Sequence, residues 1–320
     1  MTAPTQTLPK HHPFAALPEP DAQAHIAQLW VYPIKSCAGI ALQQAHLLEQ
    51  GLQWDRHWML VDEAGRFCTQ REWPRMVLIQ PQLVYDHASG ELDHLLLQAP
   101  GMPALQVPAR WSAHTAGASV RTVQVWRDSV PAHDVGDATA AWFSYFLGHS
   151  VRLVAFDPAQ QRLCSTSRTE GWQTHTRFSD GYPLLLTTDS AAQALHEDIV
   201  QHSAGQGTLP AVPSLLRFRP NIVLSDLPAH EEDYLCTLWT GTATHADARL
   251  QLVKPCVRCP IPNIDPQTAQ GDPAVGDALL RYRRDARMDG APTFGMNAVV
   301  LRPSATPLHV GQTVWVGYGV

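Results

Sequence analysis

Residues 26–42 read IAQLWVYPIKSCAGIAL, a short apolar run that stops at a lysine–serine pair and is followed by a glycine. Similar short runs occur in WMLVDEAGRFCTQ (58–70) and MVLIQPQLVYD (76–86), with glycines in and between them. Brief apolar or alternating runs separated by turn residues are typical of β-strands in a barrel or a sandwich. We therefore expect the first part of the chain to consist of short strands.

Two segments have the features of helices instead. DATAAWFSYFLG (137–148) begins with Asp137, a suitable N-cap, and ends with Gly148, a suitable C-cap. TTDSAAQALHEDIVQHSAG (187–205) has Asp189 near its start and ends at a glycine. Further strands are expected at TVQVWRDSVPAHDVG (122–136), SVRLVAF (150–156), YPLLLTT (182–188), RFRPNIVLS (217–225), HADARLQLVKPCVRC (245–259), FGMNAVVLR (294–302) and QTVWVGYG (312–319).

Strands outnumber helices in this pattern, and long helices do not alternate regularly with strands. A doubly wound parallel sheet is therefore disfavoured, and we expect a mainly β fold with a few helices, of the α+β class. A looser polar stretch near residues 157–180 divides the chain. The expected ranges are a flexible N-terminal tail at 1–25, a first domain at 26–150, a connection at 151–177 and a second domain at 178–320.

The composition excludes several classes of protein. The 23 lysines and arginines and the 29 aspartates and glutamates give a net charge of −6, and no basic run is longer than Arg283–Arg284. We therefore expect neither nucleic acid nor a membrane as a partner. The six mostly isolated cysteines argue against a disulfide framework, and no apolar stretch reaches the roughly 18 residues of a membrane span. These features predict a cytoplasmic protein.

The stretch KPCVRCPIPNIDPQT (254–268) holds two cysteines separated by two residues. A structural zinc site requires four ligands, and no second cysteine pair or spaced histidine pair follows this one. A redox dithiol requires its reactive thiol at the start of a helix, whereas Pro260 and Pro262 favour extended backbone. Two readings stay open: a pair of buried structural cysteines, or an exposed and functional Cys259. The position of Arg258 between the cysteines favours an anion nearby.

A thiolate can also hold a soft or high-valent metal through one protein bond, while an organic cofactor supplies the other ligands. Such a cofactor needs anchors on the protein, so clustered cationic and polar residues elsewhere become informative. Lys35 and Ser36 follow the first expected strand, and Arg56 precedes an apolar strand. Each of these residues alone is more often an ordinary surface charge than a cofactor anchor.

A third stretch, RFRPNIVLS (217–225), carries two arginines and an asparagine within an otherwise apolar run. Alternation along a strand would place Arg217, Arg219 and Asn221 on one face. The fork of a guanidinium group matches the oxygens of a phosphate. The stretch therefore predicts a strip that binds an anion.

Taken together and in this order, the motifs resemble the molybdenum-cofactor sulfurase C-terminal-like proteins, in which an N-terminal MOSC β-barrel domain precedes a MOSC domain. The best-known members are the mitochondrial amidoxime-reducing components. The resemblance runs from about Ile26 to Val316 and implies a barrel-like N-terminal domain and a β-barrel MOSC domain with the cofactor between them. Its motifs are VYPIKSCAGI, DRHWMLVDEAGRFCTQRE, VWRDSVPAHDVGDATAAWFSYFLG, FRPNIVL, PCVRCPIPNIDPQT and VGQTVWVG.

The resemblance also implies roles for individual residues. Cys259 would ligate molybdenum, and the pterin dithiolene of the molybdenum cofactor would supply two further sulfur ligands. Asp265 is a candidate catalytic acid by its position, and Cys256 has no assigned chemistry. The residues implied to bind the cofactor are Lys35, Ser36, Arg56, Arg219, Asn221 and Arg258, the turn residues Thr187, Thr188 and Ser190, and Asn297, which stands where the mitochondrial relatives have a tyrosine.

The function implied by the resemblance is the reduction of small N-hydroxylated or N-oxygenated compounds by a molybdenum-dependent oxidoreductase. The sequence contains no ferredoxin-type cysteine run, so no Fe–S cluster is expected in this chain. Electrons would come from a separate donor protein that carries flavin, haem or Fe–S.

An alternative stays open, because a fold resemblance cannot separate an enzyme from a carrier. The chain could bind and deliver the molybdenum cofactor, or carry sulfur on Cys259, without reducing any N-hydroxylated compound. Pyridoxal phosphate is a third association of MOSC relatives, although no lysine in this sequence stands out as its Schiff base.

Overall fold

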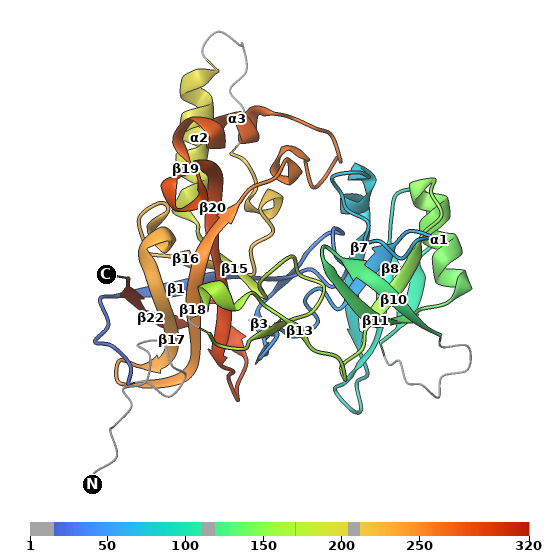
Figure 1. Cartoon of the computed structure of the whole chain (residues 1–320), viewed down its shortest axis with the longest axis horizontal. Coiled ribbons are helices and arrows are strands. Elements are labelled where there is room, and N and C mark those ends of the chain that lie inside the picture. The colour runs from blue at the N-terminus through green and yellow to red at the C-terminus, as the bar shows by residue number, and fades with distance from the viewer. Residues whose placement is uncertain (1–15, 110–118, 170, 204–211, 320) are drawn as a thin grey trace.

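The computed structural model describes residues 16–109, 119–169, 171–203 and 212–319. Two lobes lie side by side in Figure 1, one built around a large barrel and the other around smaller sheets and helix α1. The expected mainly β fold with a few helices is confirmed, with three α-helices in the part of the chain that is described.

Seven strands within the described ranges close into a barrel in the order β15, β16, β1, β22, β17, β18 and β20, and β20 pairs again with β15. The β15–β16 pair is parallel, and the other pairs around the barrel are antiparallel. The bounds are β1 (Ala22–Val31), β15 (Leu184–Thr188), β16 (Ile222–Ser225), β17 (Leu235–Thr242), β18 (His245–Val257), β20 (Ala291–Arg302) and β22 (Thr313–Tyr318).

The barrel core consists of apolar side chains that recur two residues apart along each strand. Ile222 and Leu224 in β16, and Leu250 and Leu252 in β18, are buried in one cluster. Side chains two residues apart in a strand point to the same face, so the alternating positions all face inward. This period-two pattern is the feature that made the strands recognisable in the sequence.

The second lobe contains a four-stranded sheet in the order β10, β11, β12 and β6, and a three-stranded sheet in the order β7, β8 and β9. Helix α1 packs against β12 and β9 and buries Phe143 and Phe146 in the core of this lobe. The bounds are β6 (Trp58–Val61), β7 (Gln80–Tyr85), β8 (Leu92–Gln98), β9 (Leu105–Pro108), β10 (Val120–Val125), β11 (Asp128–Asp134), α1 (Asp137–Leu147) and β12 (Arg152–Phe156).

Shorter elements join and flank these sheets. The short strands are β2 (Ile40–Leu42), β3 (Gln44–Ala45), β4 (Leu47–Leu48), β5 (Gly51–Leu52), β13 (Arg162–Leu163), β14 (His175–Thr176), β19 (Arg284–Asp285) and β21 (Leu308–His309). The remaining helices are α2 (Ser190–His202) and α3 (Ala274–Tyr282), with 3₁₀ turns at η1 (Pro74–Leu78), η2 (Thr166–Arg168), η3 (Leu215–Arg217), η4 (Glu231–Tyr234), η5 (Ile261–Asn263) and η6 (Ala286–Met288). None of the helices in the described ranges is long and apolar enough to cross a membrane.

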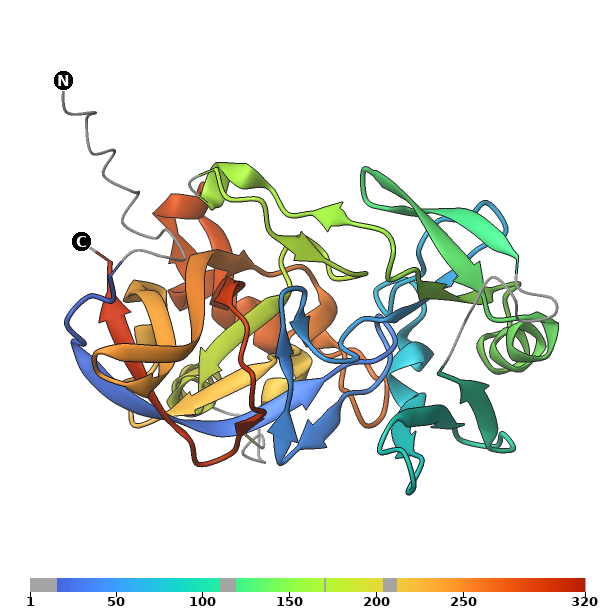
Figure 2. The same cartoon turned by 90° about the horizontal axis from the view of Figure 1, so that it is seen from below.

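Strand β1 belongs to the barrel, although the rest of the first half of the chain forms the other lobe. It pairs with β16 on one side and with β22 on the other, and Figure 2 shows it running along the barrel lobe. Residues 22–25, which the sequence assigned to the flexible tail, are part of this strand. Residues 1–15 of that tail lie outside the described residues, and the domain ranges stay a prediction.

The two expected helices are present, with one change at the start of α1. Gly136, and not Asp137, occupies the N-cap, while Gly148 adopts the left-handed conformation expected of the C-cap. In α2, the carboxylate of Asp189 accepts a hydrogen bond from the backbone N–H of Ser190.

The sequence did not predict α3. This helix buries Val275, Ala278 and Leu279 against Leu195 and Ile199 of α2. Three apolar residues among polar ones did not form a recognisable helical pattern in the sequence. Their side chains are buried because α3 packs against α2.

Two local predictions were wrong. Residues 217–225 do not form one strand, since a 3₁₀ turn ends at Arg217 and Arg219 has a positive φ of 60°. Pro220 has no N–H to donate to a ladder, and β16 begins only at Ile222. The chain after Cys259 is not extended but forms turn η5, because the φ of proline also suits the first turn of a helix.

We expect Gly295→Ala to destabilise the barrel more than Gly290→Ala does. Both glycines have a φ of +74°, so either alanine should lower the free energy of unfolding by about 1–2 kcal/mol through backbone strain alone. A Cβ at position 295 would lie 2.6 Å from the carbonyl oxygen of Leu186 in β15, whereas a Cβ at position 290 meets nothing within 4 Å. The close contact should add about 1–3 kcal/mol to the loss. Urea unfolding measures both variants, and equal losses would contradict the prediction.

Candidate functional site

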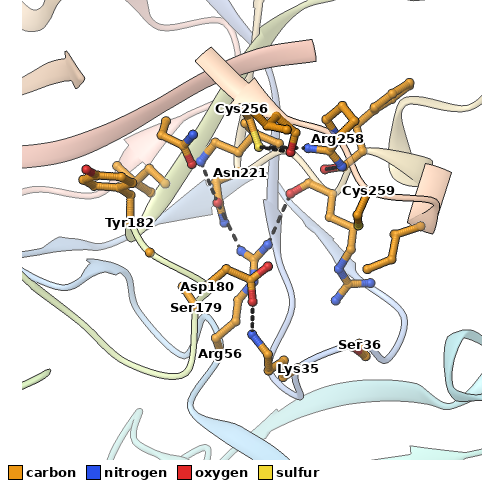
Figure 3. A pocket seen from close by; sticks show the side chains of 18 of the residues that line it. Lys35, Ser36, Arg56, Ser179, Asp180, Tyr182, Asn221, Cys256, Arg258 and Cys259 are labelled. Atoms are coloured by element: carbon orange, nitrogen blue, oxygen red, sulfur yellow. Dashed lines mark hydrogen bonds and ion pairs between the residues drawn. The ribbon is translucent and has the colours of Figure 1, made fainter. Parts of the chain in front are cut away.

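Residues from both lobes line a pocket that we call the Cys259 pocket. It contains eight of the predicted site residues, and Figure 3 shows how several of them converge on it. The pocket is lined by Lys35, Ser36, Arg56, Thr69, Arg71, residues 179–185, Phe218, Arg219, Asn221, residues 256–259, Ile261 and Asn297.

The turn that follows β1 positions Lys35 and Ser36. The backbone N–H of Lys35 donates to the carbonyl of Trp58, and Ser36 has a positive φ of 69°. The ammonium of Lys35 is buried and donates to the carbonyl of Phe178 at 2.8 Å and to the carboxylate of Asp180 at 2.5 Å. Burial lowers the pKa of Lys35, although the charge of Asp180 opposes this effect.

Asp180 is a pocket residue that the sequence reasoning missed. Its side chain is 63% exposed and also accepts a hydrogen bond from the indole N–H of Trp126 at 3.0 Å. The charge and the hydrogen bond of Lys35, and then the hydrogen bond from Trp126, hold the pKa of Asp180 below its usual range. The only signal in the sequence was a Ser-Asp-Gly turn directly before the strand at residues 184–188.

Arg56 links the two lobes. Its guanidinium donates to both carboxylate oxygens of Asp55, at 2.7 and 2.6 Å, and to the side-chain oxygen of Asn221 at 3.1 Å. Asn221 in turn accepts from the backbone N–H of Leu185 and donates to the carbonyl of Trp30. These contacts, some of which are visible in Figure 3, make Asn221 a buried bridge between β15, β1 and Arg56.

Arg219 and Arg56 both lie over the aromatic ring of Tyr32. The guanidinium carbons of Arg56 and Arg219 lie 4.5 and 4.2 Å from the ring centroid of Tyr32. Arg219 donates to the carbonyl of Cys37 at 2.7 Å, but its Nη2 has no partner among the described residues. Burial and the neighbouring charge of Arg56 lower the pKa of Arg219 to about 10.

The two cysteines have different environments. Both cysteines are partly exposed and line the pocket, and the Sγ of Cys256 also accepts a hydrogen bond from Nη1 of Arg258 at 3.1 Å. Arg258 also donates to the carbonyl of Phe218 at 3.1 Å, and its Nε is buried without a partner in the described part of the chain. The reading with a pair of buried structural cysteines is therefore wrong, and the partly exposed Cys259 lines the pocket as the functional reading requires.

The structure does not support a zinc site at the cysteine pair. Within the described ranges, no group of three or more histidine, cysteine or acidic side chains could hold a metal ion. All six cysteines are free thiols. A metal at Cys259 would therefore take most of its ligands from outside the protein.

The charges around the Cys259 pocket favour a bound anion. Two buried N–H groups, Arg219 Nη2 and Arg258 Nε, have no acceptor among the described residues. Buried donors are normally hydrogen-bonded, and guanidinium groups form their strongest hydrogen bonds with anionic oxygens. A phosphate-bearing group beside the thiol of Cys259 therefore fits this pocket. The lining holds one carboxylate, Asp180, against five cations: Lys35, Arg56, Arg71, Arg219 and Arg258.

Three predicted cofactor residues lie elsewhere. Thr187 and Thr188 are fully buried, and their hydroxyls donate to the carboxylate of Glu232 at 3.0 and 3.1 Å. The hydroxyl of Ser190 donates to the carbonyl of Leu227 at 2.9 Å. Their side chains do not line the Cys259 pocket: the two threonines at the end of β15 bind Glu232, and Ser190 at the start of α2 binds Leu227.

Asp265, the candidate acid, also lies outside the lining of the pocket. Its carboxylate forms an ion pair with Arg217 at 2.7 Å and accepts backbone N–H groups of Gln267 and Thr268. Burial acts to raise the pKa of Asp265, but the two backbone N–H groups and Arg217 outweigh burial and lower this pKa. A carboxylate that is ionised at neutral pH and closes a turn is a poor proton donor, so this geometry does not favour the acid role.

Asn297 and two further residues complete the wall. Asn297 lines the pocket and donates weakly to the carbonyl of Lys254 at 3.4 Å. Arg71 and Tyr182 were missed as individual residues, although both lie in or beside stretches that the sequence marked as unusual. Nothing in the local pattern showed that these stretches meet in space.

Glu232→Gln should change how stability depends on pH. Burial, and then the charge of Asp233, raises the pKa of Glu232 from 4.5 to about 7. The folded protein therefore holds this proton more tightly than the unfolded chain does, so wild type should lose roughly 3 kcal/mol as the pH rises from about 4.5 through 7. The glutamine does not titrate and keeps an acceptor for the threonine hydroxyls.

Urea unfolding at pH 5 and pH 8 measures this effect. The free energy of unfolding of Glu232→Gln relative to wild type should be higher at pH 8 than at pH 5. Glu197→Gln, on the exposed face of α2, serves as the control and should show the same difference at both pH values. A pH-independent difference for Glu232→Gln would contradict the prediction.

Three curated relatives are similar to this chain over most of its length. It is 28% identical over 304 residues to "Mitochondrial amidoxime-reducing component 1" of Mus musculus, covering 91% of this chain and 82% of that protein. It is 29% identical over 307 residues to "Mitochondrial amidoxime reducing component 2" of Rattus norvegicus, with the same coverage. It is 28% identical over 264 residues to "Molybdenum cofactor sulfurase" of Homo sapiens, covering 81% of this chain and 28% of that protein.

Two family models match the chain in succession. The MOSC N-terminal beta barrel domain matches residues 23–150, and the MOSC domain matches residues 173–315. The resemblance that the sequence motifs indicated is thereby confirmed. The chain belongs to the proteins that carry a MOSC N-terminal beta barrel domain followed by a MOSC domain.

Proposed function

We propose that this protein is a molybdenum-cofactor-dependent oxidoreductase that reduces N-hydroxylated compounds with electrons from a separate donor protein. The observation that carries the proposal is the Cys259 pocket, where a partly exposed thiol lies among five cationic side chains. Relatives named as amidoxime-reducing components, at 28–29% identity, support this class of activity.

In this proposal, Cys259 ligates the metal, and the cationic wall of the pocket holds the anionic part of the cofactor. The unpartnered Arg219 Nη2 and Arg258 Nε support this, because a phosphate supplies the acceptors that these buried donors lack. When bound, the molybdenum cofactor supplies the two-electron chemistry. The side chains proposed to contact the cofactor are those of Lys35, Ser36, Arg56, Arg219, Asn221, Arg258 and Asn297.

The overall reaction consumes two electrons and two protons. The N–O bond of the substrate breaks, the nitrogen keeps a hydrogen in its place, and the oxygen leaves as water. The chain's own contribution is to fix the cofactor and shape the substrate pocket. Lys35 and Arg56 contribute by binding Asp180 and Asn221, which fixes these side chains in the lining of the Cys259 pocket.

The electron donor and the cellular location stay predictions. A flavin, haem or Fe–S protein is a suitable donor, since each can deliver electrons to a partner. The cytoplasmic location rests on the cysteine pattern, while the printed names of two relatives place those proteins in mitochondria. The comparisons provide no support for pyridoxal phosphate.

The two cysteines should differ when each is replaced. In protein from a host that makes the cofactor, Cys259→Ala should contain less than about a tenth of the molybdenum of wild type, because a direct ligand is lost. Cys256→Ala should keep most of its molybdenum, since Cys256 contacts Arg258. Elemental analysis measures both variants, and near-stoichiometric molybdenum in Cys259→Ala would overturn the ligand assignment.

Turnover separates an enzyme from a cofactor carrier. With reduced methyl viologen as electron donor, the loaded protein should reduce benzamidoxime to benzamidine, and Cys259→Ala should not. A carrier would instead release its cofactor to an apo acceptor and show no reduction. That pattern would contradict the enzymatic proposal while leaving the metal ligand in place.

A further inference from the structure

A second groove adjoins the Cys259 pocket. The two share Asp180, Gly181 and Tyr182 as a common wall. We call it the Trp126 groove, and Figure 3 shows Asp180 and Tyr182 on one segment at the edge of the Cys259 pocket. The groove is lined by Trp126, Arg127, Asp128, residues 162–165, Ser167, Arg168, residues 180–182 and Lys254.

Segments from both lobes build this groove. Trp126 and Arg127 form the tip of the β10–β11 hairpin, and Arg168 ends turn η2. Lys254 lies in β18, two residues before Cys256 of the pocket. The end of β18 therefore carries one residue into the groove and another into the pocket.

Buried Arg162 holds the floor of the groove in place. It forms an ion pair with Asp128 at 2.6 Å and donates to the backbone carbonyls of Arg177, Ser179 and Asp180. The loop that separates groove and pocket is thus tied to the β10–β11 hairpin. A site built on such a fixed framework can position a ligand without a large rearrangement.

The two carboxylates of the groove are already paired, and three of its cations are not. Asp128 binds Arg162, and Asp180 binds Lys35. Arg127, Arg168 and Lys254 have no acidic partner within the described ranges. Arg127 and Arg168 are exposed, and Nζ of Lys254 lies 5.9 Å from the ring centroid of Tyr182. Three uncompensated cations in one groove stand out in a protein with a net charge of −6.

Apolar surface lies beside these cations. Trp126 is 44% exposed and Leu163 is 50% exposed. The indole N–H of Trp126 is held by Asp180 at 3.0 Å, which fixes the ring at the border between groove and pocket. Exposed apolar side chains next to unpaired cations suit a small organic anion, since the apolar body and the charged end each find a matching surface.

We propose that the Trp126 groove binds the anionic end of the substrate, so that the preferred substrates are N-hydroxylated compounds that also carry a carboxylate. This inference rests on the proposed function, with the N-hydroxyl end in the Cys259 pocket. The carboxylate lies among Arg127, Arg168 and Lys254, and the body of the molecule crosses the wall at residues 180–182.

The test compares benzamidoxime with two carboxylates of the same scaffold, 4-carboxybenzamidoxime and its longer 4-(2-carboxyethyl) homologue. Isothermal titration calorimetry on the cofactor-loaded protein measures each dissociation constant. At least one carboxylate should bind wild type about tenfold more tightly than benzamidoxime does. This advantage should shrink at high salt, because screening weakens exposed charge pairs.

The variants assign the effect to the groove. In Arg127→Ala/Arg168→Ala, the advantage of the carboxylate should fall to about twofold or less, while benzamidoxime binds as it does to wild type. Arg284→Ala/Arg302→Ala removes the same charge from two exposed arginines that line neither cavity. This control should keep the full advantage, and Arg127→Lys/Arg168→Lys should keep most of it.

Three outcomes would overturn the proposal: neither carboxylate binds more tightly than benzamidoxime, the advantage survives in Arg127→Ala/Arg168→Ala, or the control loses it equally. Turnover with reduced methyl viologen tests the proposed function separately. If no probe is reduced but the groove variant still abolishes the carboxylate advantage, the enzymatic proposal fails and the anion-binding groove stands.

Discussion

The position of β1 is the constraint on which the candidate site depends. This strand pairs with β16 and β22 in the barrel, and Trp30 exchanges hydrogen bonds with Asn221 from the adjoining segment. The chain then leaves the barrel for the other lobe within a few residues. The turn at Lys35 and Ser36 therefore lies at the junction of the lobes, opposite the residues that the MOSC domain contributes.

The second organising feature is a concentration of positive charge in a largely buried place. Two guanidinium groups lie over the ring of Tyr32, and the attraction of each cation to the aromatic ring offsets part of the cost of desolvation. Asp55 balances Arg56, but Arg219 has no carboxylate among its hydrogen-bond partners in the described part of the chain. Like charges held together in this way repel one another, and a bound anion would relieve that repulsion. The architecture thus favours an anionic ligand before any chemistry is considered.

The region between the lobes also shows how one loop can serve two cavities. Residues 180–182 form a wall of the Cys259 pocket on one side and of the Trp126 groove on the other. Lys35, Trp126 and Arg162 hold this loop from three directions. A small displacement of the loop would therefore alter both cavities together.

The sequence by itself determined the β-rich fold, the two main helices and the chemical types at the site. Period-two apolar runs and capping residues act locally, so they are readable without tertiary structure, and the motifs around Lys35, Arg56, Arg219 and Cys259 were found that way. Only the tertiary structure decided that Asp180 and Arg71 join them, that Thr187 and Asp265 do not, and that Cys256 differs from Cys259. Those outcomes depend on contacts between residues far apart in the chain, and on the turn before Ile222, where a positive φ at Arg219 overrides strand alternation. Local patterns carry no information about such contacts.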